Sequence, residues 1–206
     1  MIKIIDLLME HEYIGFGHGE ELKNIITELA HHRKNSLPVL VIASKDLSEF
    51  AKNLGFYVQS WRSAQDLPIM IDQIDWATEQ KTISFGSDGC ILERNILRLI
   101  ALKVLNIVEK DKVITGYSNE PCYIEILPEA SSIIARELLK KQYHAFFIDK
   151  YSLKGNWIMQ FGSSSIDFFW KNLKEILTIP GVLGHGLVSD SKQFLLIKNG
   201  DHYSLY

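Results

Sequence analysis

A short apolar run at residues 37–44, LPVLVIAS, constrains the fold of this chain more than any other segment. A continuous run rich in Val and Ile is typical of a strand that is covered on both faces. Residues 45–55 carry apolar side chains at helical spacing and end at Gly55, and residues 56–61, FYVQSW, predict another strand. This strand, helix, strand order predicts a parallel sheet with crossover helices.

The same alternation extends along the first half of the chain. Residues 13–32 predict a strand, a glycine-rich turn and a helix, and residues 67–76 predict a strand that ends in acids. Residues 82–89 form a glycine-containing turn, and residues 90–105 predict a strongly amphipathic helix that runs into a strand at 106–109. We therefore expect an α/β domain with a parallel sheet and crossover helices.

The pattern changes after Pro121. Residues 122–162 predict a strand, a helix and two strands joined by a tight turn at 154–156, and residues 165–183 predict a helix that ends at Pro180-Gly181. Two strands joined by a tight turn favour an antiparallel α+β module. The strand at 193–200 fits either half.

These patterns divide the chain into two closely joined domains. We expect residues 1–120 and 188–206 to form the α/β domain, and residues 121–187 to form the smaller α+β domain. With 206 residues, of which 47% are hydrophobic, the chain is long enough to bury both cores.

Charge and hydropathy exclude several classes of partner. The chain has 22 Lys and Arg against 25 Asp and Glu, a formal charge of −3, so a nucleic-acid partner is not expected. No apolar run approaches the ~18 residues of a membrane-spanning helix. Asp6 and Glu10 interrupt the start of the chain where a signal peptide stays uncharged. We expect a cytoplasmic protein.

Cysteine and histidine placement argues against a disulfide framework and against a metal. Cys90 and Cys122 are far apart in sequence, and the seven histidines show no ligand spacing. Cys90 follows Gly89 at the start of a predicted helix, where a thiol can be activated, but a buried structural cysteine is several times commoner. We expect no metal and no cofactor.

Three carboxylates are candidates for acid and base chemistry. Asp72 and Asp75 lie at the carboxyl end of a buried-type strand, where ligands of parallel α/β sheets bind, although both residues also suit a turn or a helix cap. Glu93 begins the long helix, where the helix dipole keeps a carboxylate ionised; in isolation it is more often an ordinary first-turn acid.

A glycine-rich turn at residues 15–19 connects a strand to a helix. Its backbone N–H groups could bind an anion. It lacks the dinucleotide-binding spacing, and Glu20 and Glu21 fill the first helical turn, where they would satisfy the dipole and repel a phosphate. A structural turn is therefore the stronger interpretation of this segment by itself.

The order of these segments resembles the ribose-5-phosphate isomerase A family over almost the whole chain. The family has a Gly-Thr-Gly-Ser-Thr phosphate loop, a Ser-Ser-Ser-Asp segment, a Val-Asp-Gly-Ala-Asp-Glu motif and a Lys-Gly-Gly-Gly-Ala-Ala-Leu-Thr-Arg-Glu-Lys motif. The matching segments here are IGFGHG, VIASKDLSEFAKNLGFYV, MIDQIDWA and FGSDGCILERNI, followed by YIEILPEASSIIARELL and IPGVLGHGLV.

The resemblance implies a Rossmann-like three-layer α/β domain and a smaller ferredoxin-like α+β domain, inserted before the final strand, that serves as a lid or in oligomerisation. It also implies an aldose–ketose isomerase that moves a proton between C1 and C2 of an aldose phosphate through an enediolate, in carbohydrate metabolism and the pentose phosphate pathway. By the same resemblance Glu93 is the catalytic base, and Asp72 and Asp75 handle ring opening and the sugar hydroxyls. The implied substrate-binding residues are Gly17, His18, Gly19, Ser44, Asp46, Ser84, Gly86 and Lys112.

The sequence departs from the family where substrate charge is handled. Glu20 and Glu21 replace the Ser and Thr of the phosphate loop, Ser84 replaces the lysine, and residues 85–87 replace the triple glycine. Lys81 or Lys45 are possible replacements for the lost charge. Losing one preorganised donor at a developing oxyanion typically costs ~10²–10³ in rate.

Two classes of function fit this sequence. The first is an isomerase that acts on a non-standard or unphosphorylated sugar; the second is an inactive homologue that binds a sugar, a metabolite or a partner. An acyl-CoA-transferase-like or regulatory sugar-binding domain is a weaker third. The resemblance also implies a homodimer or homotetramer through the smaller domain, and the aromatic segments 143–147 and 168–170 offer apolar surface, although core packing is the commoner role.

Overall fold

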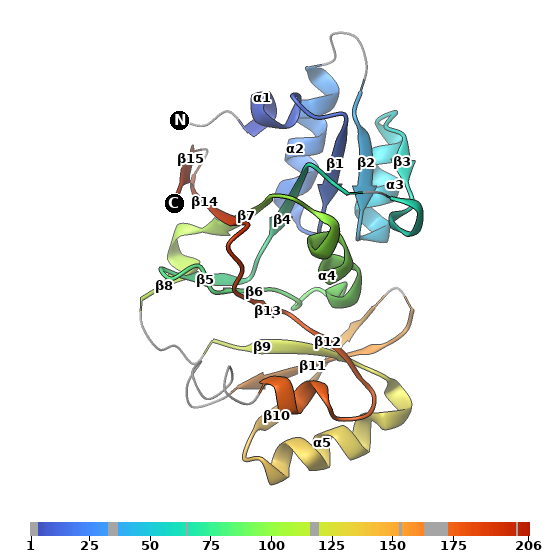
Figure 1. Cartoon of the computed structure of the whole chain (residues 1–206), viewed down its shortest axis with the longest axis vertical. Coiled ribbons are helices and arrows are strands. Elements are labelled where there is room, and N and C mark those ends of the chain that lie inside the picture. The colour runs from blue at the N-terminus through green and yellow to red at the C-terminus, as the bar shows by residue number, and fades with distance from the viewer. Residues whose placement is uncertain are drawn as a thin grey trace. The chain divides into compact units, whose positions relative to one another are not determined.

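The computed structural model describes residues 4–32, 37–64, 66–115, 120–152, 154–162, 173–200 and 202–206. The chain folds into two compact units (Figure 1). The first comprises Met1–Ile74, Glu93–Lys110 and Asp190–Tyr206, and the second comprises Asp75–Leu92 and Asp111–Ser189.

The first unit is built on a parallel sheet. Within the described residues this sheet has the strand order β15-β14-β7-β4-β1-β2-β3, and only β15 runs antiparallel to its neighbour. Its strands are β1 (Tyr13–Phe16), β2 (Val39–Ile42), β3 (Val58–Gln59), β4 (Ile69–Gln73), β7 (Val104–Glu109), β14 (Gln193–Asn199) and β15 (His202–Leu205). The predicted strand at 193–200 therefore belongs to this unit.

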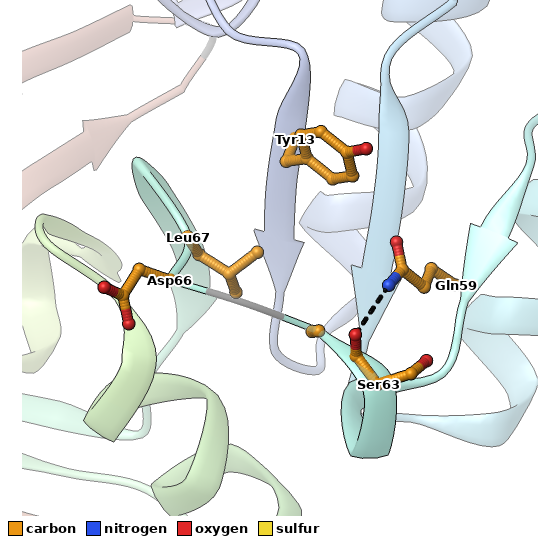
Figure 2. Close-up of a pocket in the computed structure, with 6 residues that line it drawn as sticks. Tyr13, Gln59, Ser63, Asp66 and Leu67 are labelled. Carbon is orange, nitrogen blue, oxygen red and sulfur yellow. Dashed lines mark hydrogen bonds between the residues drawn. The ribbon is translucent and has the colours of Figure 1, made fainter.

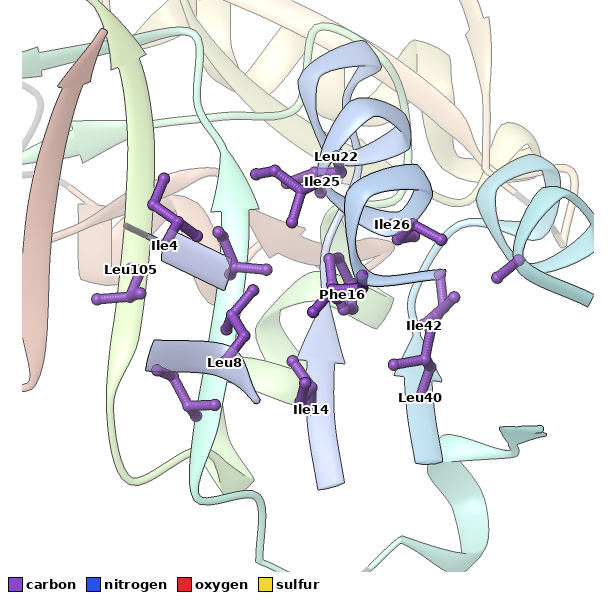
Figure 3. Close-up of a cluster of buried hydrophobic side chains, with 14 of the residues drawn as sticks. Ile4, Leu8, Ile14, Phe16, Leu22, Ile25, Ile26, Leu40, Ile42 and Leu105 are labelled. Carbon is purple, nitrogen blue, oxygen red and sulfur yellow. The ribbon is translucent and has the colours of Figure 1, made fainter. Parts of the chain in front are cut away.

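Helices cover both faces of the sheet, as a three-layer fold requires. They are α1 (Ile4–Leu8), α2 (Glu20–His31), α3 (Lys45–Asn53) and α4 (Ile91–Ile100). One face packs against α1, α2 and α3 through a buried cluster that includes the predicted stripe of α2, Leu22, Ile25, Ile26 and Leu29 (Figure 3). The other face packs Val41, Met70 and Val104 against Leu97 of α4. The Rossmann-like prediction is confirmed.

Element boundaries differ from the sequence prediction where distant residues set them. The predicted helix at 90–105 ends at Ile100, because Leu67 donates its N–H to the Ile100 carbonyl and accepts from Leu102. Lys192 adds hydrogen bonds to the carbonyls of Arg98 and Ala101. The chain then enters β7 at Val104 rather than at 106.

Two predicted strands are also shorter than expected. The strand at 56–61 is reduced to β3, because the η1 turn (Trp61–Ser63) follows with Ser60 as its cap. The strand at 67–76 divides at Ile74 into β4 and β5 (Trp76–Thr78), which pair in different sheets.

The second unit contains an antiparallel sheet with the strand order β10-β11-β9-β12 among its described residues. The strands are β9 (Cys122–Ile126), β10 (His144–Tyr151), β11 (Trp157–Gly162) and β12 (Val182–His185); α5 (Ser131–Lys140) follows the η3 turn (Pro128–Ala130), and residues 173–177 are helical. This is the split βαβ order of a ferredoxin-like module, as predicted. The rest of the predicted helix, 165–172, lies outside the described residues.

A small second sheet changes the expected domain boundary. It has the order β13-β6-β5-β8, with β6 at Ile83–Ser84, β8 at Val113–Ile114 after the η2 turn (Lys110–Lys112), and β13 at Leu187–Val188. Because these strands pair with one another, residues 75–92 and 111–120 belong to the second unit rather than to the first. The chain therefore passes between the units four times.

The core of the second unit combines aliphatic side chains with the buried aromatic rings of Trp76 and Tyr143. Ile124 and Ile126 of β9 pack with Ile134 and Leu138 of α5 in one buried cluster. Cys122 lies in the same cluster, and burial raises the pKa of its thiol to about 12. Cys90 is buried too, so both cysteines behave as small hydrophobic residues. No helix among the described residues is both long and apolar enough to cross a membrane.

Candidate functional site

The carboxyl edge of the parallel sheet gathers the predicted residues of the first unit. Gly17 follows β1, Ser44 follows β2, and Asp72 is the penultimate residue of β4. Phe16 is in register with both Ile42 and Ile71, so these three strand ends lie beside one another. This edge is where open α/β sheets bind their ligands.

Asp72 fixes the glycine loop. Its carboxylate is fully buried, and Oδ1 accepts the backbone N–H of His18 at 3.1 Å. A Cβ at Gly17 would lie 1.8 Å from the same oxygen, so the close approach of loop and carboxylate requires glycine at this position. The predicted residues Gly17, His18 and Asp72 therefore lie together in the structure.

Two arginines of α4 pair with the carboxylate of Asp72. Arg94 contacts Oδ1 with Nη2 at 3.0 Å and Oδ2 with Nε at 3.1 Å, and Arg98 Nη2 lies 2.6 Å from Oδ2. Burial lowers the pKa of Arg98, and the charge of Asp72 opposes that shift. Arg98 also contacts Asn106 at 2.7 Å, inside the sheet. Charge-assisted, bidentate contacts of this kind are the strong hydrogen bonds of proteins.

Sequence reasoning missed Arg94 and Arg98. The signal was present, because the two residues are four apart on a helix and therefore share one face, here the face that carries Leu97 and Ala101 toward the sheet. Cations on a buried helix face need an anionic partner, and Asp72 was the acid at the neighbouring strand end.

The two acids that open α2 have partners of their own. Glu20 is exposed and pairs with Lys23 at 2.7 Å. Glu21 accepts hydrogen bonds from Lys198 at 2.6 Å and from the hydroxyl of Tyr203, both on the hairpin of β14 and β15. Burial raises the pKa of Glu21, but the bonds from Lys198 and Tyr203 outweigh it and the net pKa is lowered. Glu21 thus joins α2 to the C-terminal hairpin.

The Glu21 cluster predicts an acid-sensitive contribution to stability. Because the pKa of Glu21 is lower in the folded chain than its ordinary value of 4.5, the contribution is present above pH 4.5 and is lost as the pH falls through the folded pKa. We expect Glu21→Gln to lower the free energy of unfolding by about 1 kcal/mol at pH 7. Chemical denaturation at pH 7 and near pH 3 measures this difference.

Glu20→Gln is the matched control, because its carboxylate is exposed and pairs within its own helix. It is expected to change stability by less than about 0.5 kcal/mol at either pH. A Glu21→Gln penalty that persisted unchanged at low pH would contradict the ionic origin of the effect.

Glu93 is the third residue of α4 and is almost completely buried, with 1% of its surface exposed. The preceding Leu92 donates its N–H to Glu125 Oε2 at 3.0 Å, and Asn156 Nδ2 donates to Glu125 Oε1 at 2.7 Å. The buried Glu125 therefore caps the start of the helix that carries Glu93. Sequence reasoning missed Glu125, whose signal was a single acid inside the apolar strand CYIEI.

In the second unit, Asp75 organises the turn that precedes α4. Its oxygens accept from the hydroxyl of Ser87 at 2.5 Å and from the Ser87 N–H at 3.1 Å, and its own N–H donates to the Ser84 carbonyl at 2.8 Å. Gly86 has a φ of +121°, and a Cβ there would lie 2.7 Å from Ile91. Asp75, Ser84 and Gly86 thus belong to one turn.

The other predicted binding residues, Ser44, Asp46, Ser84 and Lys112, lie at α3, in β6 and in η2. Ser44 Oγ accepts the N–H of Leu47 and caps α3, whose first turn carries the exposed Asp46. Ser84 is completely buried in β6, with its hydroxyl 3.5 Å from the Pro121 carbonyl. Lys112 is exposed in η2. Ser84 therefore offers no cation in the position of the family's lysine.

A pocket of about 220 Å³ lies elsewhere on the first unit, where Tyr13 begins β1 (Figure 2). Its lining includes Gln59, which donates to the Ser63 carbonyl at 2.9 Å. The candidate residues follow the other end of β1, so this pocket is separate from them. The described residues contain no group of His, Cys, Asp and Glu suited to a metal ion.

The parallel sheet and its covering helices define a Rossmann-like α/β protein. The chain belongs to the ribose 5-phosphate isomerase A (phosphoriboisomerase A) family, whose model matches residues 39–202. The resemblance seen in the sequence is confirmed.

Relatives of this chain agree with that assignment. Ribose-5-phosphate isomerase A of Legionella pneumophila is 28% identical over 178 residues, covering 84% of this chain and 81% of the relative, and that of Francisella tularensis is 27% identical over 175 residues, covering 84% and 78%. The fold matches ribose 5-phosphate isomerase A of Neisseria gonorrhoeae with a TM-score of 0.89 at 24% identity, covering 98% of this chain and 92% of the other. That of Methanocaldococcus jannaschii gives 0.88 at 21%, covering 99% and 94%.

Proposed function

We propose that this chain is an aldose–ketose isomerase that transfers a proton between C1 and C2 of a pentose through an enediolate. The observation that carries the proposal is the anchored loop. Asp72 holds the N–H of His18 and excludes a side chain at Gly17, so the loop at the ligand edge of the sheet is preorganised. Preorganised geometry is what a proton-transfer enzyme needs, because it removes the cost of ordering during the reaction.

In this proposal Glu93 is the base. It lies in the first turn of α4, and the cap by Glu125 fixes where this helix begins. Asp75 handles the ring oxygen and hydroxyls of the sugar. Asp72 acts on the loop, since four contacts from His18, Arg94 and Arg98 already occupy its oxygens.

The charges at the candidate site of this chain differ from those of the family motif that it resembles. Ser84, in the lysine position, is buried and uncharged, and Glu20 adds a carboxylate beside the loop. We therefore propose a substrate without a phosphate group, or with a different group in its place. Gly19, Ser44, Asp46, Gly86 and Lys112 stay candidate binding residues.

Steady-state assays test this proposal. Purified protein is incubated with D-ribose or ribose 5-phosphate, and ketose formation is measured. We expect turnover of ribose to exceed that of ribose 5-phosphate in kcat/KM. Turnover of ribose 5-phosphate at the rate of an ordinary isomerase, measured in parallel, would overturn the assignment of an unphosphorylated substrate.

A second candidate is a non-catalytic sugar-binding, metabolite-binding or partner-binding protein. The burial of Ser84 favours it, because no charge at that position stabilises a developing oxyanion. Ligand-induced melting shifts without turnover of any pentose would support this candidate.

Association is part of the proposal. We propose a homodimer or homotetramer in the cytoplasm, formed through the second unit, in a pentose-converting pathway. Phe146 and Phe147 of β10 are 60% and 47% exposed, whereas Tyr143 is buried in the core. The segment 168–170 lies outside the described residues.

A further inference from the structure

Gln73, the last residue of β4, reaches the start of α2 with its side chain. Its Oε1 accepts the backbone N–H of Glu21 at 3.0 Å, and its main-chain carbonyl accepts from Arg94 Nη2 at 2.6 Å. A Cβ at Gly19 would lie 2.2 Å from Oε1, so the amide rests directly on the loop. Hydrogen bonds therefore fix both the side-chain amide and the main-chain carbonyl of Gln73.

The N–H of Glu21 belongs to the first turn of α2, where backbone donors have no partner within the helix. Such donors, together with the helix dipole, form the usual site for a phosphate. Around this N-terminus the His18 N–H, in the loop before the helix, donates to Asp72, and the Leu22 N–H donates to the Gly19 carbonyl. Gln73 supplies the acceptor for Glu21 that a phosphate oxygen would otherwise provide.

We propose that Gln73 is a specificity-determining residue, whose amide occupies the anion position at the N-terminus of α2 and restricts the substrate to sugars with a neutral hydroxyl group there. The inference rests on the proposed function and names its substrate class. The resembling family motif, Val-Asp-Gly-Ala-Asp-Glu, has glycine where this chain has Gln73, and glycine leaves the position open.

The chemistry of an amide fits a hydroxyl better than a phosphate. The amide is uncharged, so it balances no anionic charge, whereas its Nε2 can donate to a hydroxyl oxygen and Oε1 can accept from a hydroxyl proton. The carboxylate of Glu20 lies in the same helical turn, but it is exposed and paired with Lys23, so it contributes little to this discrimination. The position of the Gln73 amide and its lack of charge therefore both favour a hydroxyl over a phosphate.

Binding measurements on Gln73→Gly test the proposal. Dissociation constants for D-ribose, ribose 5-phosphate and inorganic phosphate are measured by calorimetry. We expect Gln73→Gly to bind ribose 5-phosphate and phosphate about tenfold or more tightly than the wild type, the effect of one hydrogen bond to a charged group. Ribose affinity is expected to stay equal or to fall.

Gln59→Gly is the matched control. Gln59 is also the last residue of a strand in the same sheet, and its side chain also bonds a backbone group, the Ser63 carbonyl. It should leave all three affinities unchanged. Gln73→Ala, which keeps a Cβ in the strand, gives a second variant if Gln73→Gly does not fold.

The Glu21 amide provides a direct readout. In ¹H–¹⁵N spectra, inorganic phosphate should shift the Glu21 amide resonance in Gln73→Gly and leave it in place in the wild type. Phosphate binding to the wild type with the same affinity and the same shift would overturn the inference. Since these readouts need no turnover, a failure to isomerise any pentose would overturn the proposed function and leave this test intact.

Discussion

Replacing Asp72 by Asn is expected to lower the free energy of unfolding by about 3–5 kcal/mol. The substitution keeps the shape of the side chain and removes its charge. Arg94 and Arg98 then remain buried without the carboxylate that both contact, and desolvated guanidinium groups are costly. One Asn oxygen also cannot accept the bonds that two carboxylate oxygens accept from His18 and the arginines.

Thermal and urea unfolding measure this effect. For a chain of this size the melting temperature should fall by roughly 10 °C. Asp46→Asn is the matched control, because Asp46 is exposed in the first turn of α3, and its effect should stay within about 0.5 kcal/mol.

A double variant tests the cause. Replacing Arg98 by Met in the Asp72→Asn background removes one of the two buried guanidinium charges that lack their carboxylate. The free energy of unfolding should therefore rise part of the way back toward that of the wild type. An Asp72→Asn penalty below about 1 kcal/mol, or a double variant no more stable than the single one, would show that the ion pairs are not what holds this site.

The sequence predicted those features of the fold that short segments determine. The continuous apolar run at 37–44 contains β2, and the helical spacing of Leu22, Ile25, Ile26 and Leu29 identified the buried face of α2, because burial imposes a period on nearby residues. The strand, helix, strand order was enough to give the parallel sheet, since crossover connections leave few alternatives.

Boundaries set by distant residues could not be predicted in this way. α4 ends at Ile100 because Leu67 and Lys192 bond the carbonyls of its last turn, and neither residue is near in sequence. The division at Ile74 depends on β5 pairing with β6 and β8 instead of continuing β4. A window of residues contains no information on such partners.

The candidate site shows the same limit. Asp72 was recognised as a strand-end acid, but its arginine partners lie 22 and 26 residues away along the chain. Glu21 was interpreted as a carboxylate that would repel a phosphate. In the structure it accepts hydrogen bonds from Lys198 and Tyr203, which lie 177 and 182 residues further along the chain. The acidic start of α2 therefore carries less uncompensated charge than its sequence suggested, because Glu20 and Glu21 each pair with a lysine.

Glu93→Gln should reduce kcat by about 10²–10⁴ on whichever pentose the wild type converts, the usual contribution of a positioned general base. Glutamine has nearly the same shape as glutamate and cannot accept the proton from C2, so KM should change little. Stability should also be close to that of the wild type, which melting curves verify.

Hydrogen exchange with solvent makes this test specific to proton transfer. In D₂O the wild type should incorporate deuterium into the sugar at the carbon that receives the proton, and Glu93→Gln should lose this incorporation along with turnover. Glu129→Gln, an exposed first-turn acid of η3, should retain both. Full turnover by a folded Glu93→Gln would show that another group is the base. The role of Glu93 rests on its place in the family motif, and the buried, capped start of α4 supports a rigid position for its side chain. Loss of both turnover and deuterium incorporation in Glu93→Gln would therefore distinguish a catalytic base from an ordinary first-turn acid.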